Sequence, residues 1–215
     1  MFSPETIFRH VALARGIGPD EVHVALEDTD GIWTLAVATR DKPLLFSNVC
    51  GVLSVFGMNI LRGHAFTNPK GLVLDVFQFT DDERFLALNE DGQAQLTQML
   101  RDAVSGRMDV TVRLRGREQG VLQRAALFDP VVRIDNQASA RYTIVDIVAS
   151  NSLGLLHRVS RAISTRGCAV ELVLISTEGE RAIDVFHITK AGAKLTEGEQ
   201  QALTSDLHRT LEGAL

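Results

Sequence analysis

The chain has 215 residues, of which 45% are hydrophobic and 23% are charged, a composition typical of a folded globular protein. Its formal net charge at pH 7 is −5, and its sequence pI is about 5.7. This acidic balance argues against general binding to nucleic acid or to an anionic membrane, because both depend on clustered lysine and arginine.

The segment between residues 32 and 104 has the pattern of a strand, a helix, a β-hairpin and a second helix. Apolar residues recur at helical spacing after Leu45, and Gly57 follows where a glycine would end the helix. The hairpin turn is indicated by "NPKG", with proline and glycine at turn-compatible positions. We expect a strand at 32–41, a helix at 45–56, a hairpin at 58–80 around the turn 68–71, and a helix from Asp91 to about Val104.

The same order of elements returns later in the chain. "LVLDVFQFT" and "RAIDVFHIT" each place an aspartate in an apolar strand, and these aspartates, Asp75 and Asp184, are 109 positions apart. A period of this size indicates duplicated domains rather than a short solenoid repeat. In the second copy we expect a strand at 140–150, a helix from Leu155 that ends before Gly167, a hairpin at 169–189, and a last helix that begins near Thr196 with the capping box Thr196 and Glu199.

Each copy therefore reads strand, helix, strand, strand, helix, and one more strand completes a ferredoxin-like βαββαβ unit. We predict an α+β protein with two such units, each an antiparallel sheet with its helices on one face. "VVRID" at 131–135 is expected to complete the first unit, and the extra strand "VHVAL" at 22–26 to cover an exposed sheet edge. The expected divisions are an N-terminal linker with the extra strand at 1–31, a first domain at 32–135 and a second domain at 136–215, packed together.

The repeated aspartates lie on strands, where alternate residues share a face, so each lies on the same face as apolar side chains. A buried carboxylate needs a hydrogen-bond donor. We interpret Asp75 and Asp184 as structural carboxylates that are paired with nearby backbone or a hydroxyl, and we assign them no catalytic role.

Several other classes of site are disfavoured. The basic stretch "RLRGRE" lacks the interleaved aromatic residues that stack on RNA bases, and is interpreted as a polar linker or helix end within 113–124. The histidines lack metal-binding spacing, and the D-x-D at 28–30 precedes a glycine, as in a turn. We expect no metal and no cofactor. No apolar run approaches a membrane span or a signal peptide, and the two cysteines form no CxxC motif, which favours the cytoplasm.

The two units and their connection resemble a known family. The segments "ATRDKPLLF", "TNPKGLVLDVFQFTD", "VRIDNQAS" and "YTIVDIVASNSLGLLHRVS" are similar to the tandem ACT domains at the C-terminus of the bifunctional protein-PII uridylyltransferase/uridylyl-removing enzyme. The resemblance covers nearly all of the chain, and "VRIDNQAS" between the units is its most specific element. It implies that both units are ACT domains.

In that family a nucleotidyltransferase domain transfers UMP to a tyrosine of the PII signal protein, an HD domain removes it, and the ACT pair senses glutamine. The resemblance therefore implies a regulatory, amino-acid-sensing part in nitrogen regulation. The carboxylate and histidine clusters of both catalytic domains are missing from this sequence, so we expect no catalysis by the chain itself. The chain is expected to be a fragment of a longer enzyme or a truncated paralogue.

The effector sites are implied by the family pattern D-R-P-G-L, in which the Asp faces the ammonium of an amino acid and the glycine allows close backbone approach. An Asn or Asp at the start of the next strand often contributes as well. The first unit keeps the acid but not the glycine, and the second keeps the glycine but not the acid. The candidate residues are Asp41, Lys42, Pro43, Leu44, Leu45 and Asn59 in the first unit and, with weaker support, Asn151, Ser152, Gly154 and Leu155 in the second.

The expected ligand is a small amino acid, with glutamine first, and the expected protein partners are PII or the missing catalytic domains. Neither nucleic acid nor membrane is expected as a partner, and homodimer formation stays open. An alternative is a freestanding tandem-ACT regulator that binds a partner protein and no small ligand. An enzyme in its own right is a weaker third interpretation, because no nucleophile, base or metal cluster supports it.

Overall fold

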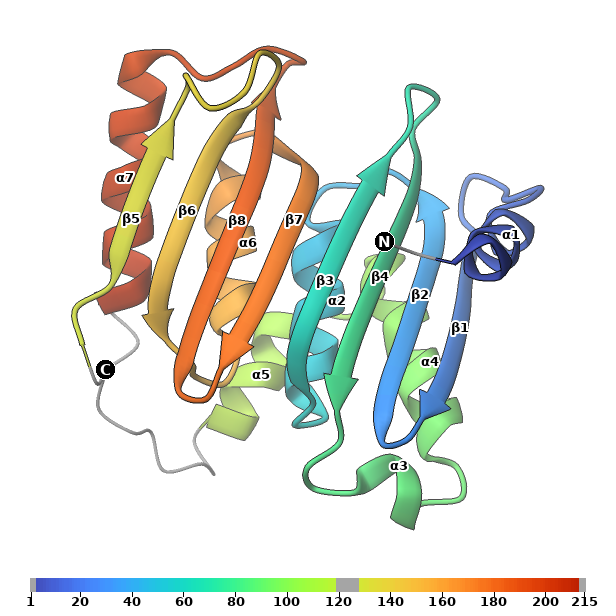
Figure 1. Cartoon of the computed structure of the whole chain (residues 1–215). Helices are drawn as coiled ribbons and strands as arrows, with labels where there is room; N and C mark the ends of the chain where they lie inside the picture. The colour runs from blue at the N-terminus through green and yellow to red at the C-terminus, as the bar shows by residue number, and fades with distance from the viewer. Residues whose placement is uncertain (1–2, 119–127, 213–215) are drawn as a thin grey trace.

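The structure is a computed structural model that describes residues 3–118 and 128–212. Two four-stranded antiparallel sheets lie side by side, and the longer helices that follow their strands cover one face of both (Figure 1). The predicted α+β class, with two antiparallel sheets and helices on one face, is confirmed.

The first half of the chain contains the sheet β1-β2-β4-β3. Helix α2 lies where the apolar pattern after Leu45 predicts a helix. Strand β4 has the bounds of "LVLDVFQFT". The elements are α1 (Pro4–Leu13), β1 (Val22–Thr29), β2 (Ile32–Arg40), α2 (Leu45–Val55), β3 (Asn59–Thr67), β4 (Leu72–Thr80), α3 (Phe85–Leu88), α4 (Gly92–Val104) and α5 (Val110–Glu118).

The second half contains the sheet β5-β6-β8-β7. Its last helix begins as the capping box predicts, since the Glu199 carboxylate accepts from the Thr196 N–H at 2.9 Å. The elements are β5 (Val131–Asp135), β6 (Thr143–Ser150), α6 (Leu155–Thr165), β7 (Cys168–Glu178), β8 (Arg181–Lys190) and α7 (Glu197–Glu212).

The edge strands correct one prediction. The strand β5 does not complete the first sheet but pairs with β6 of the second, and the first sheet is completed by β1, which pairs with β2. Hairpin closure explains both pairings, because a short connection closes at little entropic cost. The turn at Asp30 and Gly31 joins β1 to β2, and residues 136–142 join β5 to β6. In each unit the strand that completes the four-stranded sheet therefore comes before the other three strands in the sequence. We therefore propose a domain boundary ahead of Val131 rather than after Asp135.

The basic stretch at 113–118, interpreted from the sequence as a polar linker or a helix end, is a helix end in the structure. Residues 110–118 form α5, because Val110 and Leu114, one turn apart, are both buried and give this short basic helix an apolar side. Residues 119–127, the rest of the predicted linker, lie outside the described residues.

The duplication is visible in the strand register. Asp75 lies opposite Val37 and Ala65, and Asp184 lies opposite the equivalent residues Ile147 and Ile175. Both aspartates share the sheet face of the large buried apolar residues, which is the face that the helices cover. The two copies therefore place the same carboxylate at the same point of the same sheet.

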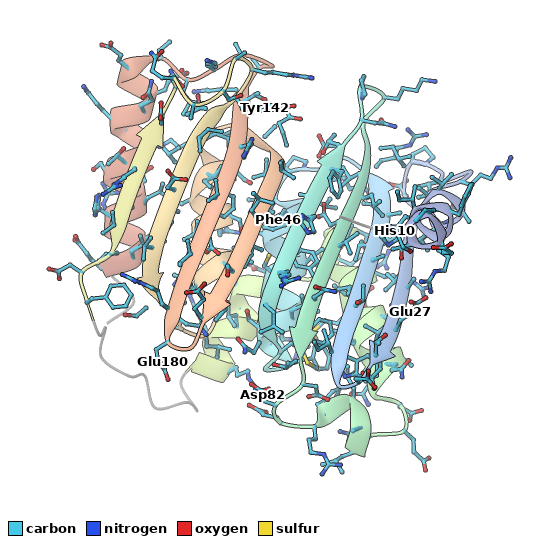
Figure 2. All side chains as sticks on the ribbon, in the orientation of Figure 1. His10, Glu27, Phe46, Asp82, Tyr142 and Glu180 are labelled. Atoms are coloured by element: carbon cyan, nitrogen blue, oxygen red, sulfur yellow. The ribbon has the colours of Figure 1, made fainter. Side chains whose placement is uncertain are left out.

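The two units join through their helices and their edge strands. Phe46 of α2, labelled in Figure 2 between the two sheets, has its ring centroid 5.3 Å from that of Phe77 and 6.5 Å from that of Phe186 in the other unit. His157 of α6 is 1% exposed, and its Nδ1 lies 2.7 Å from the Ser47 carbonyl oxygen of α2. Strand β3 lies beside β7, where the Thr177 hydroxyl donates to the Ile60 carbonyl at 2.9 Å. One buried apolar cluster runs through both units.

The packing of α2 against α5 and α6 leaves no room for a side chain at Gly51. A Cβ there would lie 2.4 Å from Val110 Cγ1 and 2.7 Å from His157 Nδ1, whereas a Cβ at Gly116 of α5 would meet nothing within 4 Å. We expect Gly51→Ala to lower the free energy of unfolding by about 1–3 kcal/mol through overpacking, although alanine favours helix. The matched variant Gly116→Ala should raise it by roughly 0.5–1 kcal/mol. Urea denaturation of both variants tests this, and equal stabilisation by both would contradict the tight seam.

Candidate functional site

Two pockets lie at the seam between the units, and most of the predicted site residues line them. The Asp41 pocket, with a volume of about 360 Å³, contains Asp41, Lys42, Pro43, Leu44, Leu45 and Asp75 from the first unit, together with Ala169 and Glu171 from the second. The Asn151 pocket, of about 190 Å³, contains Asn151, Ser152, Gly154, Leu155 and Asp184 from the second unit, together with Asn59 and Ile60 from the first.

The arrangement is reciprocal, because each pocket combines the strand-to-helix loop of one unit with the start of the edge strand of the other. Asn59 therefore lies with Asn151 and not with Asp41, so the expectation that Asp41 and Asn59 serve one site is wrong. The reason is geometric. The 11 residues of α2 stand between Asp41 and Asn59, and a helix of that length rises about 16 Å. The residue that takes the place of Asn59 in the Asp41 pocket is Ala169.

The loop backbone is the same in both pockets. Leu44 has φ 63° and ψ 12°, and Gly154 at the equivalent position has φ 72° and ψ 6°. In each loop the residue after this position bonds back by its N–H, Leu45 to the Lys42 carbonyl at 3.2 Å and Leu155 to the Ser152 carbonyl at 3.1 Å. Leucine in place of glycine has therefore not changed the loop, because Leu44 holds the same left-handed conformation as Gly154.

The floor of the Asp41 pocket is a buried acid. Asp75 is 1% exposed, and neither of its carboxyl oxygens has a hydrogen-bond partner among the described residues. Burial, and after it the negative charge of Asp41, raises the pKa of Asp75 well above its ordinary value. The interpretation of Asp75 as a paired structural carboxylate is therefore wrong, since within residues 3–118 and 128–212 no backbone or hydroxyl donor bonds to it.

Asp184 is the corresponding acid in the Asn151 pocket. It is also 1% exposed, its Oδ1 has no hydrogen-bond partner among the described residues, and burial raises its pKa to about 7. The side chains around it are neutral, namely Asn59, Asn151 and Ser152. Arg158 holds the loop from outside, donating to the Leu153 carbonyl at 2.8 Å and to the Ser152 hydroxyl at 2.9 Å.

The two pockets thus differ in charge. Three acids line the Asp41 pocket, since Glu171 joins Asp41 and Asp75 from across the seam. Burial, and after it the charge of Glu171, raises the pKa of Asp41. Glu171 accepts a hydrogen bond from the Thr189 hydroxyl at 2.8 Å, which holds its carboxylate in place. Lys42, which also lines this pocket, lies with its Nζ 3.4 Å from the Asp20 carboxylate. A ligand with an ammonium group suits this field better than an anion does.

The sequence did not indicate Glu171 as a site residue, because it reaches the Asp41 pocket only through the packing of the second unit on the first. It did single out Asp75 and Asp184, through their repeated position, but not their place in the pockets. Within residues 3–118 and 128–212, no group of three or more His, Cys, Asp or Glu is arranged to hold a metal ion. No helix in the same part of the chain is long and apolar enough to cross a membrane.

Comparison with known proteins returns one recurrent relative. The chain is 31% identical over 209 residues to the bifunctional uridylyltransferase/uridylyl-removing enzyme of Azospirillum brasilense, 30% over 204 residues to that of Gluconobacter oxydans, and 29% over 221 residues to that of Rhodospirillum rubrum. These matches cover 94%, 91% and 100% of the chain. The chain is similar over most of its length to one region of these enzymes. The predicted resemblance is confirmed.

The chain spans about a fifth of these relatives, 22% of the Azospirillum and Gluconobacter enzymes and 23% of the Rhodospirillum enzyme. No protein-family model matches the sequence. Among solved structures, an aspartate kinase from Synechocystis aligns with 85% of this chain and 27% of its own, with a TM-score of 0.43 and 14% identity.

The buried acid of the Asn151 pocket predicts a pH-dependent stability. Because the pKa of Asp184 rises from 3.8 to about 7 on folding, the folded protein keeps a proton that the unfolded chain releases between these values. The contribution of the protonated Asp184 carboxyl to the free energy of unfolding is fully present below about pH 4 and is lost as the pH rises to about 7. We expect Asp184→Asn to be more stable than wild type at pH 8 by a few kcal/mol, and to lose less stability between pH 4 and 7. Urea denaturation across this range tests it, and parallel pH profiles would contradict it.

The shared loop backbone predicts opposite effects of two substitutions. Leu44→Gly should raise the free energy of unfolding by up to about 1 kcal/mol, because it removes the cost of a left-handed leucine while losing part of the contact of a half-buried side chain. Gly154→Ala should lower it by about 1–2 kcal/mol for the same backbone reason. Denaturation curves measured side by side decide this. Destabilisation by both would mean that the Leu44 side chain contributes more than its backbone costs.

Proposed function

We propose that this chain is a regulatory module that binds a small amino acid in the Asp41 pocket, and that glutamine is the first ligand to test. One observation carries the proposal. The Asp41 carboxylate lies at the edge of a pocket whose other wall comes from the second unit, directly before the start of α2. An acid beside a helix N-terminus matches the two charged groups that every free amino acid carries.

The binding mode follows from these two features. Asp41 accepts hydrogen bonds from the α-ammonium, and backbone N–H groups in the first turn of α2, near Leu45, hold the α-carboxylate. The side chain of the ligand then extends toward β4 and Asp75. Asn59 plays no part in this pocket, because it lines the other one.

Binding at this place also supplies a regulatory mechanism. The pocket wall combines the loop before α2 with the end of α6 and the start of β7, so a ligand contacts both units at once. The ligand stabilises the arrangement in which the loop before α2 and the start of β7 both contact it. The relative position of the two units is thereby coupled to ligand concentration, and a change in that position can alter contacts with other domains or with a partner such as the PII protein.

The chain itself is proposed to be non-catalytic. The related enzymes are named for two activities, uridylyl transfer and uridylyl removal, and the matched region is about a fifth of each of them. Three pocket acids without a repeated histidine or a metal-binding group do not form the cluster that phosphoryl chemistry needs.

Calorimetric titration with glutamine tests the proposal. We expect binding by the wild type and a loss of about 1.5–3 kcal/mol in binding free energy for Asp41→Asn, the range for hydrogen bonds to a charged group. Asn151→Ala, in the other pocket, is the control and should change the affinity very little. Absence of both heat and thermal stabilisation at millimolar concentrations of glutamine and other small amino acids would contradict amino-acid sensing.

A second candidate function, a protein-interaction regulator without a small ligand, is favoured by a basic groove on the helical side. The groove between α5, α6 and α7 has a volume of about 380 Å³ and is lined by Arg115, Arg158, Arg161 and Arg209 with a single acid, Asp206. Asp206 pairs with Arg166 at 2.5 Å and with Arg209 at 3.4 Å, and the three further arginines leave the groove with an excess of positive charge on an acidic protein. This surface suits an acidic segment of a partner protein.

A further inference from the structure

The unpartnered carboxyl of Asp75 is the feature that the binding mode above leaves unexplained. It lies on the floor of the Asp41 pocket, on the central strand β4, and is 1% exposed without a hydrogen-bond partner among the described residues. A buried polar group without a partner costs free energy, and native proteins contain few of them. A partner supplied by the ligand would remove that cost whenever the pocket is occupied.

We propose that Asp75 selects the distal end of the bound amino acid: it pairs with a terminal N–H group, in a carboxamide or an ammonium, and rejects a carboxylate. This inference rests on the proposed function, because it requires an amino acid held by Asp41 at the mouth of the same pocket. Asp75 is then a specificity-determining residue at the far end of the ligand.

The charges around the floor support the exclusion of a carboxylate. Asp41 and Glu171 are the other ionisable acids that line the pocket, and both repel a second negative charge on the ligand. Lys42 does not offset them fully, since its ammonium faces Asp20 at 3.4 Å. An apolar end group is disfavoured for a different reason, because it would leave the Asp75 carboxyl buried and still unpaired.

The two kinds of N–H group are distinguished by the proton on Asp75, because burial raises the pKa of this carboxyl and so favours its protonated form. A carboxamide forms two hydrogen bonds with the protonated acid, donating its N–H to the carboxyl C=O and accepting the carboxyl O–H at its own oxygen, so no proton leaves. An ammonium instead pairs with the ionised carboxylate. The carboxyl proton then passes to the buffer, and one proton is released for each ligand bound.

Calorimetry with the full chain tests the inference with four ligands, namely glutamine, lysine, glutamate and norleucine, in two buffers of different ionisation enthalpy. We expect at least one of glutamine and lysine to bind about tenfold or more tightly than both glutamate and norleucine. A heat that is independent of the buffer identifies the carboxamide, and a heat that changes with the buffer identifies the ammonium.

Variants assign the selectivity to Asp75. Asp75→Ala should bind glutamine, lysine and norleucine within about threefold of one another, while Asp41 and Glu171 still disfavour glutamate. Asp146→Ala, at a strand aspartate that lines neither pocket, should keep the wild-type order. If Asp75→Ala does not fold, Asp75→Asn serves, because its amide still pairs with glutamine but loses proton release and any preference for lysine.

The outcomes separate this inference from the proposed function. Binding of glutamate or norleucine as tightly as glutamine and lysine in the wild type would overturn the role of Asp75 and leave amino-acid sensing intact. Retention by Asp75→Ala of the wild-type preference over norleucine would overturn it as well, and so would retention by Asp75→Asn of proton release or of a preference for lysine. Absence of binding by all amino acids would instead contradict the proposed function itself.

Discussion

Helices α2 and α6 pack against each other, and His157 of α6 bonds to α2. Phe46 of α2 extends this contact to both sheets. His157 also extends it to helix α5, because its Nε2 lies 3.4 Å from the Thr111 Oγ1. Gly51 permits this approach, since a side chain there has no room. The loop that precedes each helix consequently lies beside the far end of the other helix. Neither pocket exists in a single unit, and the seam that stabilises the fold is also the wall of both candidate sites.

The duplicated units share a backbone but have diverged in chemistry. Their loops adopt the same left-handed turn, with a leucine at one place and a glycine at the other. The side chains that the loops present are different, namely Asp41 and Lys42 in the first unit and Asn151 and Ser152 in the second. Two pockets with the same loop backbone but different charged side chains can bind different groups. One can bind a charged group, while the other contributes to the fold or binds a different ligand.

The two buried aspartates connect these sites to the core. Burial raises the pKa of the Cys50 thiol in α2, and the nearby carboxyls of Asp75 and Asp184 raise it further, so both acids lie close to the same helix. Such groups oppose stability in the free protein, since they are held among apolar residues without full pairing. Departures of this kind from the rules of core packing concentrate at functional sites, where a bound group offsets their cost.

Local patterns in the sequence determined the type and approximate bounds of most strands and helices, the capping box at Thr196, and the duplication. These features depend on residues within a few positions of one another, where the periods of strand and helix act directly. The repeat of Asp75 at Asp184 needed no structure either, because it is a property of the sequence alone.

Only the tertiary structure decided which strand closes each sheet, that Asn59 and Asp41 belong to different pockets, and that Glu171 faces Asp41. It also decided that Asp75 has no hydrogen-bond donor in the part of the chain that the structure describes. The first outcome followed from hairpin closure, which favours a neighbouring strand over a distant one. The others depend on how the first unit packs on the second, across a seam formed when two helices bury their apolar faces. A pattern that is read over a few residues contains no information about such a contact, because it depends on how the completed units pack.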